Sequence, residues 1–342
     1  MKGNNLNGNL KGINANIIPL NKKNNNQENE NTFEQKEINN TLNNFNYPIN
    51  STNTDNLNTV SPDTIQKLKE IVNQADILEI EVISSISNQK GEKIKINSLG
   101  MLEKSKRKAF DGNTFFGFLG EENDGNEADT ENLNKEVDYV IKPKERNNDS
   151  KNIGRYFRIR YDLNTMGYLI KDLECGFGTF KKITEKTKLR DCYLINMGIS
   201  YIVCSFGIDE LNLSEASIII DADKILNIKV YSEMQNAELH FFNPQQFKRI
   251  YIGRDASCNI IVDDTLLSRI HCTIEYKEGN GEGWYISDGK AGDDFNEEKL
   301  STNGTWLCLL EETPVKDGMI FKSNQNQFKC KIIKQKKNKK QK

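Results

Sequence analysis

Three short groups of polar residues in the C-terminal half of this 342-residue chain carry side chains that could bind an anion. Arg254 lies in the first group, Ser268 and Arg269 in the second, and Thr302 and Asn303 in the third. A guanidinium fork, hydroxyl donors and backbone N–H groups that converge from separate loops are the groups that hold a phosphate ester in proteins. The residue types therefore predict a phosphate-binding site assembled from several loops.

Short apolar segments with alternating polarity flank these groups and predict the β-strands that position them. The segments lie at residues 249–252, 259–262, 273–276 and 284–287. Loops on a rigid sheet are a frequent place for recognition residues, because the sheet fixes where each loop begins and ends. We therefore expect each polar group to lie in a turn between strands.

The order of these motifs resembles that of the forkhead-associated (FHA) domain, a module that binds phosphothreonine peptides. The motifs are Gly253-Arg254, the segment from Ser268 to Cys272, and the segment from Ser301 to Trp306. The resemblance covers roughly residues 225–334 and implies a β-sandwich whose binding loops gather at one end. Phosphothreonine carries about −1.5 to −2 charges at neutral pH, which suits the cationic residues of the motifs.

The resemblance also implies roles for single residues. The implied phosphopeptide ligands are Arg254, Ser268, Arg269, Thr302 and Asn303, and the implied supporting residues are Gly253, His271 and Gly304. His271 is expected to brace the Ser268 loop without touching the ligand. No residue of this set is expected to be catalytic.

Each motif by itself also has a purely structural interpretation. Gly-Arg after a strand is a common turn, and a lone histidine is more often a satisfied structural residue than a ligand. Asn303-Gly304 is first of all a hairpin turn, since both residues tolerate positive φ. The ordered combination, with strands between the motifs, favours the binding interpretation, and a turn can be structural and still present its Asn side chain.

A second β-rich region precedes the first one and spans residues 77–213. Its alternating segments predict strands at 78–82, 93–96, 114–119, 137–141, 156–161, 167–172, 178–180, 193–198 and 201–206. The segment order is similar to that of residues 225–334, which indicates a diverged FHA-like copy and a weak internal repeat. The expected fold class is therefore all-β, with two antiparallel β-sandwich (FHA/SMAD-like) domains in series.

The diverged copy has other residues where the second copy has its implied ligands. Gly117-Phe118 or Leu119-Gly120 stands in place of Gly-Arg, Ile153 or a neighbour in place of the Ser, Tyr156 in place of the His, and Phe177 in place of the Asn. A basic cluster remains at Lys142, Lys144, Arg146, Lys151 and Arg155, and a solvated charged loop is its favoured interpretation. We therefore expect a scaffold that does not bind phosphopeptides.

The remaining segments have simpler compositions. Residues 1–60 are rich in Asn and poor in apolar side chains, which is typical of disorder. Ser61-Pro62-Asp63 predicts the start of a short helix within 61–76 that packs on the domain edge. A linker at 214–224 separates the copies, and residues 335–342 form a Lys-rich tail.

One loop and the C-terminal tail could modify the function. The acidic loop from Gly289 to Leu300 lies directly before the third motif, and we expect it to shape or screen the site. The segment Lys334–Lys342 holds six lysines and no acid, so it could contact nucleic acid or direct nuclear import. The alternative function is accordingly a nucleic-acid-associated nuclear protein with the FHA domain as a docking module.

Several classes of protein do not fit the sequence. The formal net charge is −2, no apolar run is long enough to span a membrane, and the beginning of the chain lacks a hydrophobic signal core. No P-loop, kinase or zinc-protease motif occurs, so no enzyme, cofactor or metal is expected. The seven cysteines form no C-x-x-C pair and predict reduced thiols in the cytoplasm or nucleus. The expected partner is a phosphothreonine-containing protein, and the oligomeric state is left open.

Overall fold

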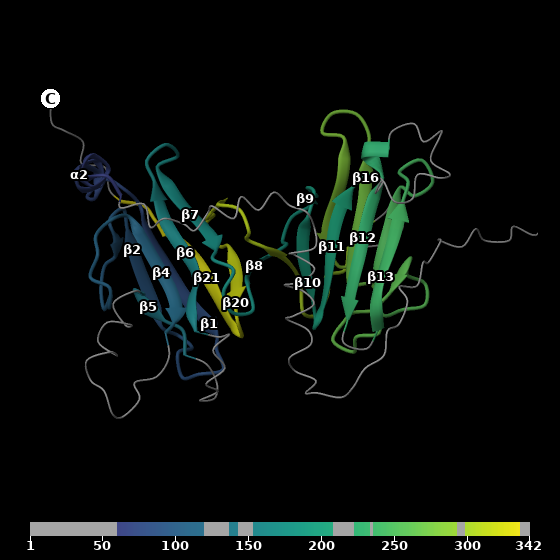
Figure 1. Ribbon diagram of the computed structural model, residues 1–342, viewed down its shortest axis with the longest axis horizontal. Coiled ribbons are helices and arrows are strands. Elements are labelled where there is room, and N and C mark those ends of the chain that lie inside the picture. Colours follow the sequence, from purple (N-terminus) through teal and green to yellow (C-terminus); the bar gives the residue numbers. More distant parts are fainter. Residues whose placement is uncertain are drawn as a thin grey trace, which may run out of the picture. The chain divides into compact units, whose positions relative to one another are not determined.

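The structure is a computed structural model that describes residues 60–119, 137–142, 153–207, 222–232, 235–292 and 298–335 (Figure 1). These residues form mostly antiparallel β-strands, with one α-helix, α2 (Pro62–Ile71), and one short 3-10 helix, η5 (Ala222–Lys224). The expected all-β class is confirmed. The N-terminal residues before 60 and the lysine tail after 335 lie outside the described residues.

The described residues fold into two compact units that divide the sequence at Ile183/Thr184 and again at Thr305/Trp306. We call residues 184–305 the central unit, and residues 60–183 together with 306–335 the split unit. The central unit is thus one continuous segment, whereas the split unit is made of two. The consecutive ranges 77–213 and 225–334 expected from the sequence divide the chain differently.

The split unit contains two sheets. Its first segment supplies β1 (Ile77–Ser84), β2 (Lys93–Asn97), β3 (Gly100–Met101), β4 (Asn113–Phe118), β5 (Tyr139–Val140), β6 (Gly154–Asp162), β7 (Gly167–Asp172) and β8 (Thr179–Lys182). Its second segment supplies β19 (Thr313–Pro314), β20 (Ile320–Ser323) and β21 (Asn326–Ile333), after β18 (Thr305–Cys308) at the boundary. One sheet has the order β19-β7-β6-β4-β5, and the other includes β18-β8-β20-β21-β1-β2-β3.

The central unit also contains two layers of strands. Its strands are β9 (Thr187–Lys188), β10 (Tyr193–Met197), β11 (Ser200–Phe206), β12 (Leu226–Ser232), β13 (Gln235–Phe242), β14 (Arg249–Gly253), β15 (Ile260–Ile261), β16 (Cys272–Lys277) and β17 (Gly283–Asp288). One layer has the order β13-β12-β11-β10, and the other has the order β15-β14-β16-β17-β9.

In each unit, strands that lie far apart in the sequence pair with each other. In the split unit, β21 pairs antiparallel with β1, so that Ile80 faces Cys330 and Val82 faces Phe328. In the central unit, β11 pairs antiparallel with β12, so that Cys204 faces Ile228. Figure 1 shows the exchange by colour, with yellow β20 and β21 beside blue β1, and teal β10 and β11 beside green β12 and β13.

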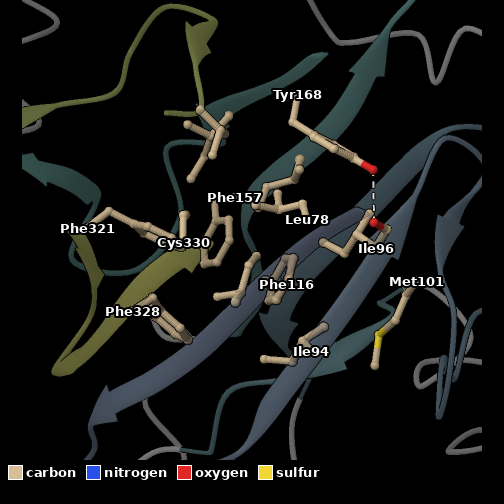
Figure 2. Close-up of a cluster of buried hydrophobic side chains, with 14 of the residues drawn as sticks. Leu78, Ile94, Ile96, Met101, Phe116, Phe157, Tyr168, Phe321, Phe328 and Cys330 are labelled. Carbon is tan, nitrogen blue, oxygen red and sulfur yellow. Dashed lines mark hydrogen bonds between the residues drawn. The ribbon is translucent and has the colours of Figure 1, made fainter. Parts of the chain in front are cut away.

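Aromatic side chains from both segments fill the core of the split unit (Figure 2). Phe157 on β6 stacks on Phe116 of β4, with ring centroids 4.4 Å apart. The same ring meets Phe321 of β20 edge-on at 5.3 Å, and Phe321 stacks on Phe328 of β21 at 4.9 Å. Each buried aromatic ring contributes roughly 1.5–3 kcal/mol relative to its exposed form. The exchanged hairpin β20–β21 therefore belongs to this core and does not merely lie along its edge.

The helix α2 begins where the sequence predicts it. The Ser61 side chain accepts a hydrogen bond from the Thr64 amide at 3.2 Å and caps the helix. Leu68 is 2% exposed and joins the split-unit core, and its carbonyl accepts a hydrogen bond from the Ser98 hydroxyl at 3.0 Å. No helix among the described residues is long and apolar enough to cross a membrane.

Candidate functional site

Three loops of the central unit carry the predicted ligands, and close backbone contacts hold the first two together. Arg254 directly follows β14, and its amide donates to the Ser268 carbonyl at 3.3 Å. The next amide, of Asp255, donates to the Arg269 carbonyl at 3.1 Å. A Cβ atom on Gly253 would lie 2.3 Å from that Arg269 oxygen, so the approach of the loops requires glycine here.

The third loop contacts the second through polar groups of the motifs themselves. The Thr302 amide donates to the Ser268 hydroxyl oxygen at 2.9 Å, and that hydroxyl lies 3.4 Å from the Thr302 hydroxyl. The Asn303 side-chain amide donates to the Leu266 carbonyl at 2.8 Å. The structure therefore brings Ser268, Thr302 and Asn303 together from distant parts of the sequence.

His271 lies buried beneath the second and third loops and contacts both. Its Nδ1 atom accepts a hydrogen bond from the Ser268 amide at 3.1 Å, and its Nε2 atom lies 3.0 Å from the Gly304 carbonyl oxygen. Because one partner is a donor and the other an acceptor, the neutral ring with its proton on Nε2 satisfies both. These are the contacts that a bracing role requires.

Replacing His271 by Ala should lower both thermal stability and ligand binding. The change leaves the half-buried Ser268 amide and the buried Gly304 carbonyl without partners and opens a cavity, which together cost about 2–4 kcal/mol. Calorimetry and peptide titration on the same sample measure the two effects. Loss of binding at an unchanged melting temperature would contradict the bracing role and indicate direct contact with the ligand.

A buried carboxylate fixes the base of the third loop, and sequence reasoning missed it. Asp288 ends β17, and its Oδ1 atom accepts hydrogen bonds from the Ser301 hydroxyl at 2.6 Å and the Thr305 hydroxyl at 2.7 Å. The Ser301 hydroxyl oxygen in turn accepts from the Gly304 amide at 2.9 Å. Gly304 has φ +78°, so the turn needs a residue that tolerates the left-handed region. The sequence signal that could have revealed this contact is an acidic residue at the end of a predicted strand, with Ser301 and Thr305 further along the chain.

The loops surround a pocket of about 470 Å³. Four of the five predicted ligands line it, namely Arg254, Ser268, Arg269 and Thr302. Asn303 is not among the lining residues, so its contact with a peptide main chain stays a prediction. The sequence did not single out two further lining residues, Lys290 and Lys299, although the loop that holds them was expected to shape the site.

The pocket is electropositive. Arg254, Arg269, Lys290 and Lys299 line it, and among the residues that the structure describes none of them forms a salt bridge. Asp255 is the acidic residue of the lining, and its Oδ1 atom accepts hydrogen bonds from the Ser257 hydroxyl and amide at 2.7 and 3.0 Å. These bonds, and then the charges of Arg269 and Arg254, lower the pKa of Asp255. The Asp255 carboxylate is thus hydrogen-bonded within its own loop and forms no described salt bridge with either arginine.

The split unit repeats the close backbone approach but not the ligands. A Cβ atom on Gly117 would lie 2.2 Å from the Gly154 carbonyl oxygen. The corresponding distance at Gly253 in the central unit is 2.3 Å, to the Arg269 carbonyl oxygen. Of the two alternatives that the sequence left open, Gly117-Phe118 includes the glycine with this close approach. Phe118 is 9% exposed and packs in the core, so this loop has no guanidinium there.

The apolar loop positions of the split unit are partly exposed. Ile153 is 40% exposed and Phe177 is 46% exposed, and the Phe177 amide donates to the Asn324 side chain at 2.9 Å. Of the predicted basic cluster, Lys142 and Arg155 are described, and the other members lie outside the described residues. The guanidinium of Arg155 lies 4.4 Å from the centroid of the Phe115 ring. The prediction that this unit does not bind phosphopeptides stays a prediction.

A buried carboxylate also ends β7 of the split unit, where Asp172 is the last residue, as Asp288 is the last residue of β17. Asp172 is 2% exposed, and its Oδ1 atom has no hydrogen-bond partner among the described residues. Burial raises the pKa of Asp172 to about 7, against smaller opposing effects of hydrogen bonds from Thr179 and Glu174. A carboxyl group whose pKa is raised in the folded state is more easily ionised in the unfolded state.

Replacing Asp172 by Asn should therefore stabilise the protein at neutral and higher pH. The wild-type free energy of unfolding should fall as pH rises from about 4 to about 7 and then level off, and this loss, about 2–4 kcal/mol, should be absent in the variant. Urea denaturation at pH 5 and pH 8 measures it. Asp288→Asn is the matched control and should destabilise, because the Asp288 carboxylate is hydrogen-bonded. Equal pH dependence of Asp172→Asn and wild type would contradict the prediction.

Comparison with known proteins identifies one domain. Residues 250–322 match the family model of the FHA domain, and the chain contains an FHA domain there. No curated protein matches the chain. The solved Slr1951 protein from Synechocystis sp. is 19% identical, with a TM-score of 0.16, and the match covers 28% of this chain and 88% of that one. EmbR from Mycobacterium tuberculosis, solved with a low-affinity phosphopeptide, is 18% identical, with a TM-score of 0.12, and the match covers 27% of this chain and 22% of EmbR.

Proposed function

We propose that the FHA domain at residues 250–322 binds phosphothreonine-containing proteins, and that the chain acts as an adaptor or scaffold without catalytic activity. The partner would be recognised through one phosphorylated threonine and the peptide around it. The pocket of the central unit is the place where we expect the phosphate to bind.

The convergence of Arg254, Ser268 and Thr302 in one pocket is the observation that carries this proposal. The Thr302 amide donates a hydrogen bond to the Ser268 hydroxyl oxygen at 2.9 Å, which holds the Ser268 and Thr302 hydroxyl groups 3.4 Å apart. A guanidinium with no salt bridge among the described residues lines the same pocket. Charge-assisted hydrogen bonds from such donors are roughly twice as strong as neutral ones and suit a phosphate dianion.

The other parts of the proposal have narrower support. Asn303 is exposed beside the pocket loops, where its side chain could also meet a peptide main chain. All seven cysteines are free, which suits the reducing cytoplasm or nucleus that the sequence predicts. Nucleic-acid binding by the lysine tail remains the alternative from the sequence, and the structure adds a contact of Lys334 with Asp76 at 2.6 Å.

Titration of the full chain with threonine phosphopeptides tests the proposal. A phosphopeptide library selects the peptides, and each is compared with its unphosphorylated form and with the phosphoserine form. We expect binding that requires the phosphate and that survives removal of residues 336–342. If no threonine phosphopeptide binds, or if the unphosphorylated forms bind equally well, the proposed function is wrong.

A further inference from the structure

The two lysines of the pocket belong to the loop between β17 and β18, and they face each other across a short antiparallel bridge. The Lys290 amide donates to the Lys299 carbonyl at 2.8 Å, and the Lys299 amide donates back at 3.0 Å. Residues that exchange both hydrogen bonds in this way lie directly opposite, with Cα atoms about 5.5 Å apart and side chains on the same face. The two ammonium groups therefore share one face of the bridge.

The contacts at both ends of the loop fix this bridge in place. Gly289 has φ +73°, and a Cβ atom there would lie 2.0 Å from the Lys299 carbonyl oxygen, so the two backbones approach as closely as glycine allows. At the other end, the Ser301 amide and hydroxyl donate to the Asp288 carboxylate at 3.2 and 2.6 Å. The loop that carries the lysine pair is thus held by the same buried carboxylate, Asp288, that fixes the third binding loop.

Like charges directly opposite each other on one face of a β-pair are destabilising. Neither lysine forms a salt bridge with any carboxylate that the structure describes, so no described partner offsets this repulsion. Both side chains line the pocket together with Arg254 and Arg269. An anion between the lysines would convert the repulsion into two attractive contacts.

The charge of the lining exceeds what one phosphate needs. Four cationic side chains and the single carboxylate of Asp255 give the lining residues a formal excess of three positive charges. A phosphothreonine side chain supplies about −1.5 to −2 charges, so at least one positive charge remains. Arg254, Ser268 and Thr302 are the expected ligands of the first phosphate, which leaves the lysine pair for a second group.

We propose that Lys290 and Lys299 form a second anion site, so that the preferred ligand is a phosphothreonine peptide with another anionic side chain nearby. This inference rests on the proposed function, because the second site gains its ligand through binding of the first. Lysine ammonium groups act as point charges and do not require a planar partner, so a phosphate and a carboxylate share the chemistry. The higher charge of a second phosphate should make it the stronger ligand.

Isothermal titration of the full chain with four kinds of synthetic peptide tests the second site. One carries a single phosphothreonine with neutral neighbours, the second adds a phosphorylated residue, the third adds Asp or Glu, and the fourth has the acidic residues but no phosphate. The added group is placed at each of the four positions on either side. We expect the doubly phosphorylated peptide to bind roughly tenfold more tightly than the singly phosphorylated one, with the acidic peptide between them.

The double variant Lys290→Gln/Lys299→Gln should remove this preference, and it should weaken the binding of the doubly phosphorylated peptide more than that of the neutral phosphopeptide. Lys329→Gln/Lys331→Gln is the matched control, since it removes the same charge from two exposed lysines that do not line the pocket. A preference that is absent in the wild type, or that persists in the double variant, would overturn the second site. If no phosphopeptide binds at all, the proposed function fails with it, and the two failures are therefore distinguishable.

Discussion

Arg254→Ala should weaken the binding of a threonine phosphopeptide by about 2–5 kcal/mol, which is the range for truncating one partner of a hydrogen-bonded charge pair. The guanidinium lines the pocket and has no salt bridge with a described residue, so its removal takes away a predicted ligand and breaks no described salt bridge. The fold should persist, because the backbone bond from Arg254 to Ser268 does not involve the side chain.

Arg254→Lys separates the charge of this residue from its shape. Lysine keeps the positive charge but lacks the planar fork that binds phosphate oxygens in pairs, so we expect an intermediate loss of affinity. Titration of both variants against one phosphopeptide, with circular dichroism as the test of folding, measures the effects. Unchanged affinity in a folded Arg254→Ala protein would show that Arg254 is not a phosphate ligand.

The sequence predicted the strands well because a strand is encoded locally. The alternation of Gly167 to Asp172 predicted a strand over the residues that form β7, and its observed burial alternates in the same way. Alternation states which face of a strand is buried but not which strand lies beside it. The exchange of β20–β21 with β10–β11 was missed for this reason.

For the candidate site, too, the sequence located some of the residues that line the pocket and missed others. The motif order located Arg254, Ser268 and Thr302, whose pocket the structure then placed in the central unit. Lys290 and Lys299 were missed because a backbone bridge places them opposite each other, and the spacing of eight intervening residues does not reveal this bridge. The role of the β10–β11 hairpin in the site was also invisible, because it depends on the exchange.

That hairpin braces the loop that carries Ser268. Asp264 is 2% exposed, and its Oδ2 atom accepts hydrogen bonds from the Ile199 amide and the Ser200 hydroxyl, each at 2.9 Å. Its Oδ1 atom accepts from the Leu266 amide at 2.8 Å, within the loop itself. The turn between β10 and β11 therefore supports the binding loop, although it lies far from the motifs in sequence.

The hairpin β20–β21 would fit poorly in the same place. Phe321 and Phe328 would stand where Ile195 and Ile202 fill the central core, and overpacking of this kind costs roughly 1–3 kcal/mol for each site. Asn324 would stand in place of Gly198. A Cβ atom at Gly198 would already lie 2.6 Å from the Asp264 carboxylate, so an Asn would disturb the brace.

We therefore expect a fragment of residues 184–309 to fold and to bind phosphopeptide with an affinity similar to that of the full chain. It contains the continuous central unit and all of β18. A fragment of residues 222–342 contains every predicted ligand but lacks β9, β10 and β11, and it should neither melt cooperatively nor bind. Loss of three buried side chains, Ile195, Met197 and Ile202, removes about 1.5–3 kcal/mol each, against a typical net stability of about 5–15 kcal/mol.

A rescue variant distinguishes poor fit from simple truncation. Phe321→Ile, Asn324→Gly and Phe328→Ile together give the hairpin of fragment 222–342 the core volumes and the glycine turn of β10–β11, so this fragment should recover part of its folding and binding. Calorimetry and titration of the three fragments against one phosphopeptide measure this order. If the unmodified 222–342 fragment folds and binds as tightly as the full chain, each sequence copy completes itself and the exchange is not needed for the site. Because the binding loop depends on Asp264 and the β10–β11 turn, we expect phosphopeptide affinity to depend on whether residues 184–207 are present.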